Sequence, residues 1–111
     1  MIALALSLMA SGPDPNAVSM VAGELSSFCS SDDKQLRLMC SGYVGAISDI
    51  MVGMGVASGK AVFCMPPGLS VDKERQIVIA YVESHPELAT HNAAMVVQQA
   101  LATVLACPKG D

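Results

Sequence analysis

The stretch that decides how this chain folds is CSSDDKQLRLMC, residues 29–40. It begins on a cysteine, passes through small and acidic residues that favour a turn and a helix N-cap, and ends on a second cysteine. Cys29 is expected to close one helix, and Cys40 to lie one or two turns into the next. The two cysteines are therefore close across a short turn, which predicts a disulfide between neighbouring helices.

Two further cysteines, Cys64 and Cys107, bracket the second half of the chain. Four cysteines permit three connectivities, and their order alone does not choose among them. If the two helices between Cys64 and Cys107 form a hairpin, these cysteines lie at the same end of it. We therefore favour the pairs Cys29–Cys40 and Cys64–Cys107, with structural roles. Widely spaced cysteines fit such disulfides, in an oxidising compartment, better than a metal site or a redox motif.

Apolar residues recur at helical spacing in four segments, and no convincing strand pattern occurs. The helices are expected at about residues 14–31, 33–53, 70–85 and 90–107. The predicted fold is all-α, a small bundle of four main helices stapled by two disulfides, with consecutive helices as antiparallel neighbours. The expected buried positions are Ala17, Val21, Leu25 and Phe28 in the first helix, Leu36, Met39, Cys40, Tyr43, Val44, Ile47, Ile50 and Met51 in the second, Ile77, Ala80 and Tyr81 in the third, and Val97, Ala100, Leu101 and Val104 in the fourth.

The beginning of the chain has the pattern of an export signal. Ile2 to Ala10 is an uncharged apolar run, too short to span a bilayer, and small residues follow it. No Lys or Arg precedes the run, so the basic segment of a signal peptide is missing or lies upstream. We interpret residues 1–12 as a signal-peptide remnant and residues 13–111 as a single helical domain, exported to the periplasm. The alternative is that the run forms a first helix of the fold.

Composition excludes several functions. The net charge is −4 and no stretch collects basic residues, so nucleic acid is not expected as a partner. Once the signal is removed, no membrane association is expected either. Gly53 to Ala61 departs from phosphate-loop spacing, and the cysteines and two histidines lack the close ligand pair that zinc sites show. We expect no cofactor, no metal and no enzymatic activity.

Several motifs, in order, resemble the Rap/Tai immunity-protein family. They are Cys40-Ser-Gly42-Tyr43-Val44, then Asp49, Phe63-Cys64-Met65-Pro66-Pro67-Gly68, Tyr81-Val-Glu-Ser-His85-Pro86, Ala100-Leu101 and Cys107. The resemblance covers roughly residues 17–108. It implies a periplasmic protein, associated with type VI secretion, that binds and inhibits a peptidoglycan amidase effector. It also implies that two copies of the chain can form a homodimer.

An inhibitor of this kind presents a loop to the enzyme, and two loops are candidates, Gly53 to Lys60 and Glu83 to His91. We favour the second, because helix ends and Pro86 hold it stiff, so that less entropy is lost on docking. The expected partner-binding residues are Glu83, Ser84, His85, Glu87 and His91.

Two other functions stay open. One is an acid-stress chaperone similar to the small helical periplasmic protein HdeA, in which protonated carboxylates and charge repulsion open the fold at low pH. The other is a helical periplasmic binding protein of unknown partner. Client aggregation assays at low pH distinguish the first from an immunity protein.

Overall fold

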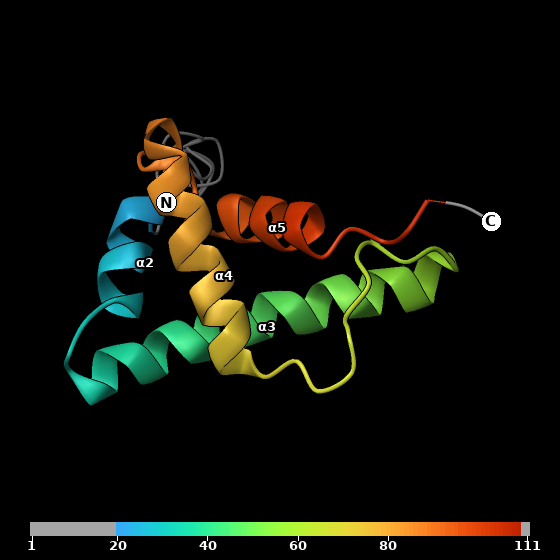
Figure 1. Cartoon of the computed structure of the whole chain (residues 1–111), viewed down its shortest axis with the longest axis horizontal. Helices are drawn as coiled ribbons and strands as arrows, with labels where there is room; N and C mark the ends of the chain where they lie inside the picture. The colour runs from blue at the N-terminus through green and yellow to red at the C-terminus, as the bar shows by residue number, and fades with distance from the viewer. Residues whose placement is uncertain (1–19, 110–111) are drawn as a thin grey trace, which may run out of the picture.

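The computed structural model describes residues 20–109, which form four α-helices and one short 3-10 helix (Figure 1). The helices are α2 (Ala22–Cys29), α3 (Lys34–Ser58), α4 (Val71–Ser84), η1 (Pro86–Leu88) and α5 (Ala93–Val104). The described part contains no strand, so the predicted all-α class is confirmed. The signal-peptide segment 1–12 and the expected helix start at Asp14-Pro15 lie outside the described residues.

Short polar residues set where three of the helices begin. Asp33 caps α3, Ser70 caps α4 and Asn92 caps α5, each through a side-chain oxygen that accepts a backbone N–H bond. Gly59 ends α3 with a φ of 73°, a left-handed conformation that glycine adopts without steric cost. Local sequence therefore determines these boundaries.

The first described helix begins later than its apolar spacing predicts. Met20 and Val21 are not helical, because Val21 forms an isolated antiparallel bridge with Asn92. The backbone N–H of Ala22 donates to His91 O, and that of Ala93 donates to Met20 O, both at 2.9 Å. The expected continuous helix through Val21 is wrong, since the backbone there pairs with a distant segment instead.

Helix α3 is longer than expected. Its glycines do not end it at Gly53, and it continues as a regular helix to Ser58. A Cβ atom at Gly55 would lie 3.3 Å from both Lys60 O and Ala61 Cα, so glycine there lets the chain fold back closely against the helix. The predicted loop from Gly53 to Lys60 is thus mostly helix, and that prediction is wrong.

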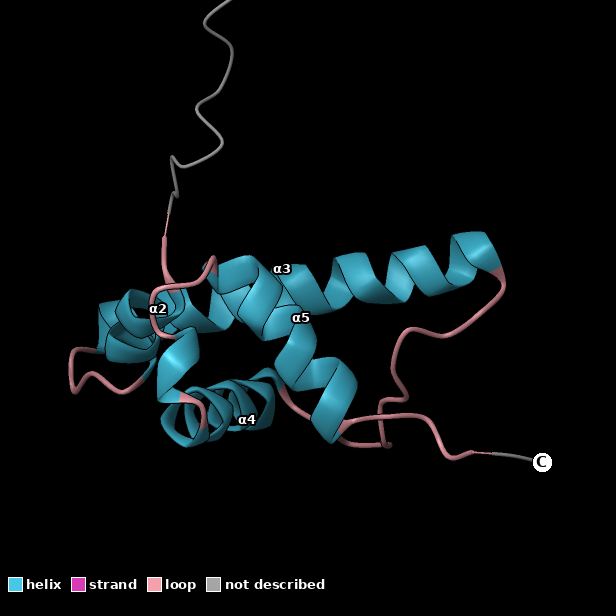
Figure 2. Ribbon diagram, turned by 90° about the horizontal axis from the view of Figure 1, so that it is seen from above, coloured by secondary structure: helices cyan, strands magenta, loops and turns pink. Residues whose placement is uncertain are grey.

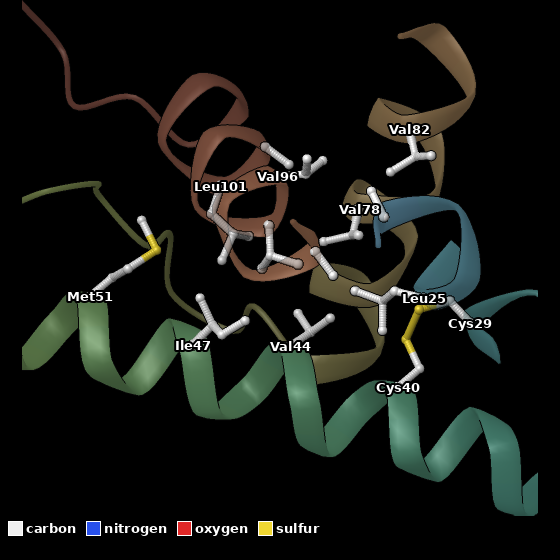
Figure 3. Close-up of a cluster of buried hydrophobic side chains, with 14 of the residues drawn as sticks. Leu25, Cys29, Cys40, Val44, Ile47, Met51, Val78, Val82, Val96 and Leu101 are labelled. Atoms are coloured by element: carbon white, nitrogen blue, oxygen red, sulfur yellow. A yellow bond between two sulfur atoms is a disulfide. The ribbon is translucent and has the colours of Figure 1, made fainter. Parts of the chain in front are cut away.

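All four helices contribute to one apolar core, which Figure 3 shows in close-up. Helix α3 points Cys40, Val44, Ile47 and Met51 into it at helical spacing. The remaining buried apolar residues of the core are Ala22, Leu25, Cys29, Phe63, Val78, Val82, Ala93, Val96, Val97, Ala100 and Leu101.

Four residues expected in the core are exposed instead, namely Met39, Ile50, Ala80 and Val104. Each lies at the edge of the apolar stripe of its helix, and the neighbouring elements cover only the middle of that stripe. On α4 the buried face is centred on Val78 and Val82, while Ile77 and Tyr81 are half-buried. The helical spacing of the buried residues was predicted correctly, but the width of the buried helix face was not.

Helix α4 crosses α3 instead of lying along it, as the two views in Figures 1 and 2 agree. The connecting segment, residues 59–70, returns from the end of α3 to its middle, where a Cβ at Gly45 would lie 3.6 Å from Val71. Nothing lies within 4 Å of a Cβ at Gly42, so glycine is not required there by close packing. The expectation of antiparallel neighbours is wrong for this pair, because the connection is long enough to redirect the chain.

Both predicted disulfides are present. Cys29–Cys40 joins the end of α2 to α3 with a Cα–Cα distance of 5.0 Å, and both residues are fully buried. Cys64–Cys107 ties the α3–α4 connection to the segment after α5, with a Cα–Cα distance of 4.7 Å. Beside it the backbone N–H of Cys64 donates to Leu105 O at 2.8 Å. The two bonds therefore fasten opposite parts of the fold.

Candidate partner-binding site

The segment expected to bind a partner lies at the end of α4. His85 caps the helix with φ −130° and ψ 66°, a conformation that leaves the helical region, and Pro86 begins the 3-10 turn η1. Proline fits at this first position because it lacks the N–H that would be unpaired there. A motif of two residues thus ends one helix and starts the loop.

Backbone hydrogen bonds hold the loop 83–91 in one shape. Within it, Leu88 N donates to His85 O and His91 N donates to Leu88 O, both at 2.9 Å. Across to α2, Gly23 N donates to Ala89 O at 2.9 Å. A Cβ at Gly23 would lie 3.2 Å from Ala89 O, so glycine permits this close approach. The loop is fastened at both ends.

The imidazole of His85 is held in place by Tyr81. Its Nδ1 atom lies 2.8 Å from Tyr81 O, and the two rings stack with centroids 4.1 Å apart. His85 lies at the C-terminal end of α4, as the expected helix over about residues 70–85 implies, and the stacking on Tyr81 was not predicted from the sequence. Tyr81 is therefore not only a core residue.

The other predicted partner-binding residues form no hydrogen bonds with one another. Glu83, Glu87 and His91 are exposed, and in the described part of the chain none of them forms an ion pair. The Ser84 hydroxyl donates to Ala80 O at 2.9 Å, so it is engaged within α4. Glu24, an exposed acid that was not predicted from the sequence, lies in the first turn of α2, the helix that contacts Ala89. The loop end of the molecule is consequently acidic.

A second surface lies at the far end of α3, where the helix extends past α5 (Figures 1 and 2). Exposed apolar side chains gather there, and a groove of about 410 Å³ runs between the helix and the returning chain. Met51 is buried as core filler, whereas Met54 is exposed. The groove is lined by Met51, Val52, Gly55, Val56, Gly59, Ala61, Val62, Phe63 and Met65.

Glu74 is a carboxyl group buried between α4 and α3. It is only 3% exposed, and its Oε2 atom has no hydrogen-bond partner. Burial raises the pKa of the Glu74 carboxyl, a hydrogen bond with the Ser48 side chain opposes that shift, and the charge of Asp49 adds to it. Native protein therefore keeps this proton to a higher pH than unfolded protein does.

Replacing Glu74 by methionine is expected to stabilise the protein at neutral pH by roughly 1–3 kcal/mol, because it removes a buried carboxyl group that has an oxygen without a hydrogen-bond partner. Between the unfolded pKa, near 4.5, and the raised native pKa, the native state binds more protons, so stability falls as pH rises. The variant's advantage should grow over that interval and be constant above it. Urea unfolding of wild type and variant from pH 4 to 8 measures this difference in the free energy of unfolding. Glu83→Met, an exposed acid on the same helix, is the control, and a pH-independent advantage for Glu74→Met contradicts the assignment.

No cluster that could hold a metal occurs among residues 20–109. All four cysteines are joined in disulfides, which removes any thiol nucleophile. These features define a class, a small helical domain cross-linked by two disulfides and carrying an acidic, hydrogen-bonded loop.

The family model for Rap1a immunity proteins matches residues 22–107, which is most of the chain, so the chain belongs to this family. The resemblance drawn from the motifs is thereby confirmed. Membership implies an immunity protein that binds a cognate secreted effector, in a family that is not typically enzymatic. No curated protein and no solved structure matches the chain significantly. The disulfides are consistent with an exported protein.

Proposed function

We propose that this protein is a periplasmic immunity protein that binds and inhibits a peptidoglycan amidase effector of type VI secretion. The inhibitory element is the loop 83–91, which docks in the amidase cleft. The observation that carries this assignment is the hydrogen bonding of the loop to α2 through Gly23 and Ala89. A loop that is already ordered loses little conformational entropy on binding.

Charge reversal in the loop tests the proposal. The double variant Glu83→Lys/Glu87→Lys is expected to inhibit the cognate amidase about 100-fold more weakly, since unfavourable charge contacts across an interface cost several kcal/mol and each 1.4 kcal/mol is tenfold. Both side chains are exposed and form no ion pair within the described residues, so the thermal midpoint should change little. Amidase assays on purified peptidoglycan measure the inhibition.

A control variant reverses the charge of one acid away from the loop. Asp32→Lys changes an exposed acid at the other end of α2, in the turn before α3, and should leave inhibition unaltered. If the loop variant still inhibits at the wild-type concentration, the loop is not the inhibitory element. If the wild type inhibits no amidase that its own secretion system delivers, the proposed target class is wrong.

We further propose that two copies associate through an apolar ridge on α3, defined by Val52 and Val56, which lie one turn apart on the same side of the helix and both line the groove. Both are exposed, and residues 50–59 carry no charge, so no like charges meet at this contact between two chains of net charge −4. Within the described residues α3 alone is long and apolar enough to cross a membrane, by length and composition only. Its inner face packs against the other helices, as in the core helix of a globular domain.

The acid-stress chaperone is less well supported. A chaperone of that kind must open as pH falls, yet the raised pKa of Glu74 makes this group favour the native state on acidification. Each disulfide also restricts opening, one within the core and one at the surface. We therefore retain the inhibitor as the proposed function.

A further inference from the structure

A shallow cleft of about 240 Å³ lies beside the loop, along the outer face of α4. Five of its lining residues belong to α4 and its cap, Ile77, Ala80, Tyr81, Ser84 and His85, and the sixth is Val104, the last residue of α5. The walls are mostly apolar, and Ser84 and His85, at the C-terminal end of α4, contribute polar side-chain atoms. The cleft therefore lies beside the last turns of two helices.

The hydrogen bond to Tyr81 determines which ring nitrogen of His85 is free. A carbonyl oxygen only accepts, so Nδ1 must carry the proton that it donates to Tyr81 O at 2.8 Å. In the neutral ring Nε2 then bears a lone pair and is an acceptor. The Ser84 hydroxyl donates its own proton to Ala80 O, which leaves its oxygen as a second acceptor. A ligand for this end of the cleft must supply donors.

The electrostatics of the cleft favour a cation. The C-terminal end of a helix carries partial negative charge, which basic residues in the last turn commonly offset. Neither α4 nor α5 has a basic residue in its last turn. The exposed residues Glu83 and Glu87 lie within three residues of Ser84 along the chain, although neither lines the cleft. The negative ends of α4 and α5 and the carboxylates of Glu83 and Glu87 are therefore not offset by a basic side chain from the last turn of either helix.

We propose that the cleft binds an arginine side chain of the partner protein. The alkyl stem lies against Ile77 and Val104, and the guanidinium donates to Nε2 of His85 and to Ser84 Oγ. Aromatic rings attract a flat cation, and the stacked pair of Tyr81 and His85 supplies two of them. This inference deepens the proposed function, on which it rests for the identity of the partner, by naming the chemistry that the loop end recognises.

NMR of the full domain tests both parts of the inference, the tautomer of His85 and the binding of a guanidinium group in the cleft. Nitrogen-15 shifts of the imidazole at pH 8 should show Nδ1 protonated in His85. Addition of n-butylguanidinium should then move the His85 Nε2 and Val104 methyl signals with a millimolar Kd. The neutral analogue n-butylurea, at the same concentrations, should bind at least tenfold more weakly.

Two variants make the result specific. His85→Phe keeps a ring that can stack on Tyr81 but removes the acceptor, and should weaken n-butylguanidinium binding about tenfold. His91→Phe changes the exposed histidine outside the cleft and should leave it unchanged. An Nε2-protonated His85, equal binding of the urea, or no shift with the guanidinium overturns the inference. These readouts need no amidase, so they stay separate from the inhibition assay that tests the proposed function.

Discussion

Replacing Cys64 and Cys107 together by serine should lower the free energy of unfolding by about 4 kcal/mol, the loop-closure entropy expected for a bond across 43 residues. A domain of this size is typically stable by only 5–15 kcal/mol, so the loss is a large part of the total. Cys64 is exposed and Cys107 half-buried, so serine introduces no buried hydroxyl. Urea unfolding of oxidised wild type and variant measures the difference.

The other disulfide provides the comparison. Cys29–Cys40 closes only 11 residues, for which the same entropy is about 3 kcal/mol. Its cysteines are fully buried, so dithiothreitol should reduce Cys64–Cys107 in the native protein first and reach Cys29–Cys40 only as the core opens. Mass spectrometry after alkylation orders the two events. Equal reduction rates, or an unchanged unfolding energy in the Cys64/Cys107 variant, contradict this account.

Wild-type protein at micromolar concentration should sediment at twice the mass of its chain, and Val56→Asp should sediment as a monomer. Val56 is 79% exposed on the α3 ridge, where it also lines the apolar groove. An aspartate buried there between two copies has no partner charge, which costs several kcal/mol and weakens association at least 100-fold. Sedimentation equilibrium measures the change.

Leu38→Asp is the matched control, because it adds the same charge to the same helix at a position that is 65% exposed. It lies 18 residues before Val56, about 27 Å along the helix axis. This variant should remain dimeric. A wild-type monomer, or a dimer that survives Val56→Asp, means that the ridge is not the self-association surface.

Much of the local structure could be read from the sequence. Asp33, Ser70 and Asn92 each act as an N-cap through their own side chain, so their positions predict helix starts without knowledge of the fold. The glycines in α3 misled the prediction of its end. Gly53 and Gly55 cost helix stability, but the helix continues to Ser58 and ends at Gly59, where a left-handed residue is needed.

The candidate site, too, could be predicted only in part from the sequence. His85-Pro86 marks the end of α4 because proline disfavours helix in the residue before it. The sequence does not reveal that Ala89 pairs with Gly23, nor that Val104 borders the cleft beside His85. Those contacts join segments far apart in the chain, and their geometry depends on how the helices cross.

The amino-acid sequence alone determined the helical class and the family, since capping and periodicity act over short distances along the chain. The disulfide pairs followed from it only with the further assumption of a helical hairpin between Cys64 and Cys107, which are 43 residues apart. Tertiary structure decided which apolar residues stay exposed, and it brought the buried Glu74 against α3. The reason is that an apolar stripe specifies a face but not how much of it a crossing helix covers. That coverage follows from the packing angle, which the long connection after Gly59 leaves free.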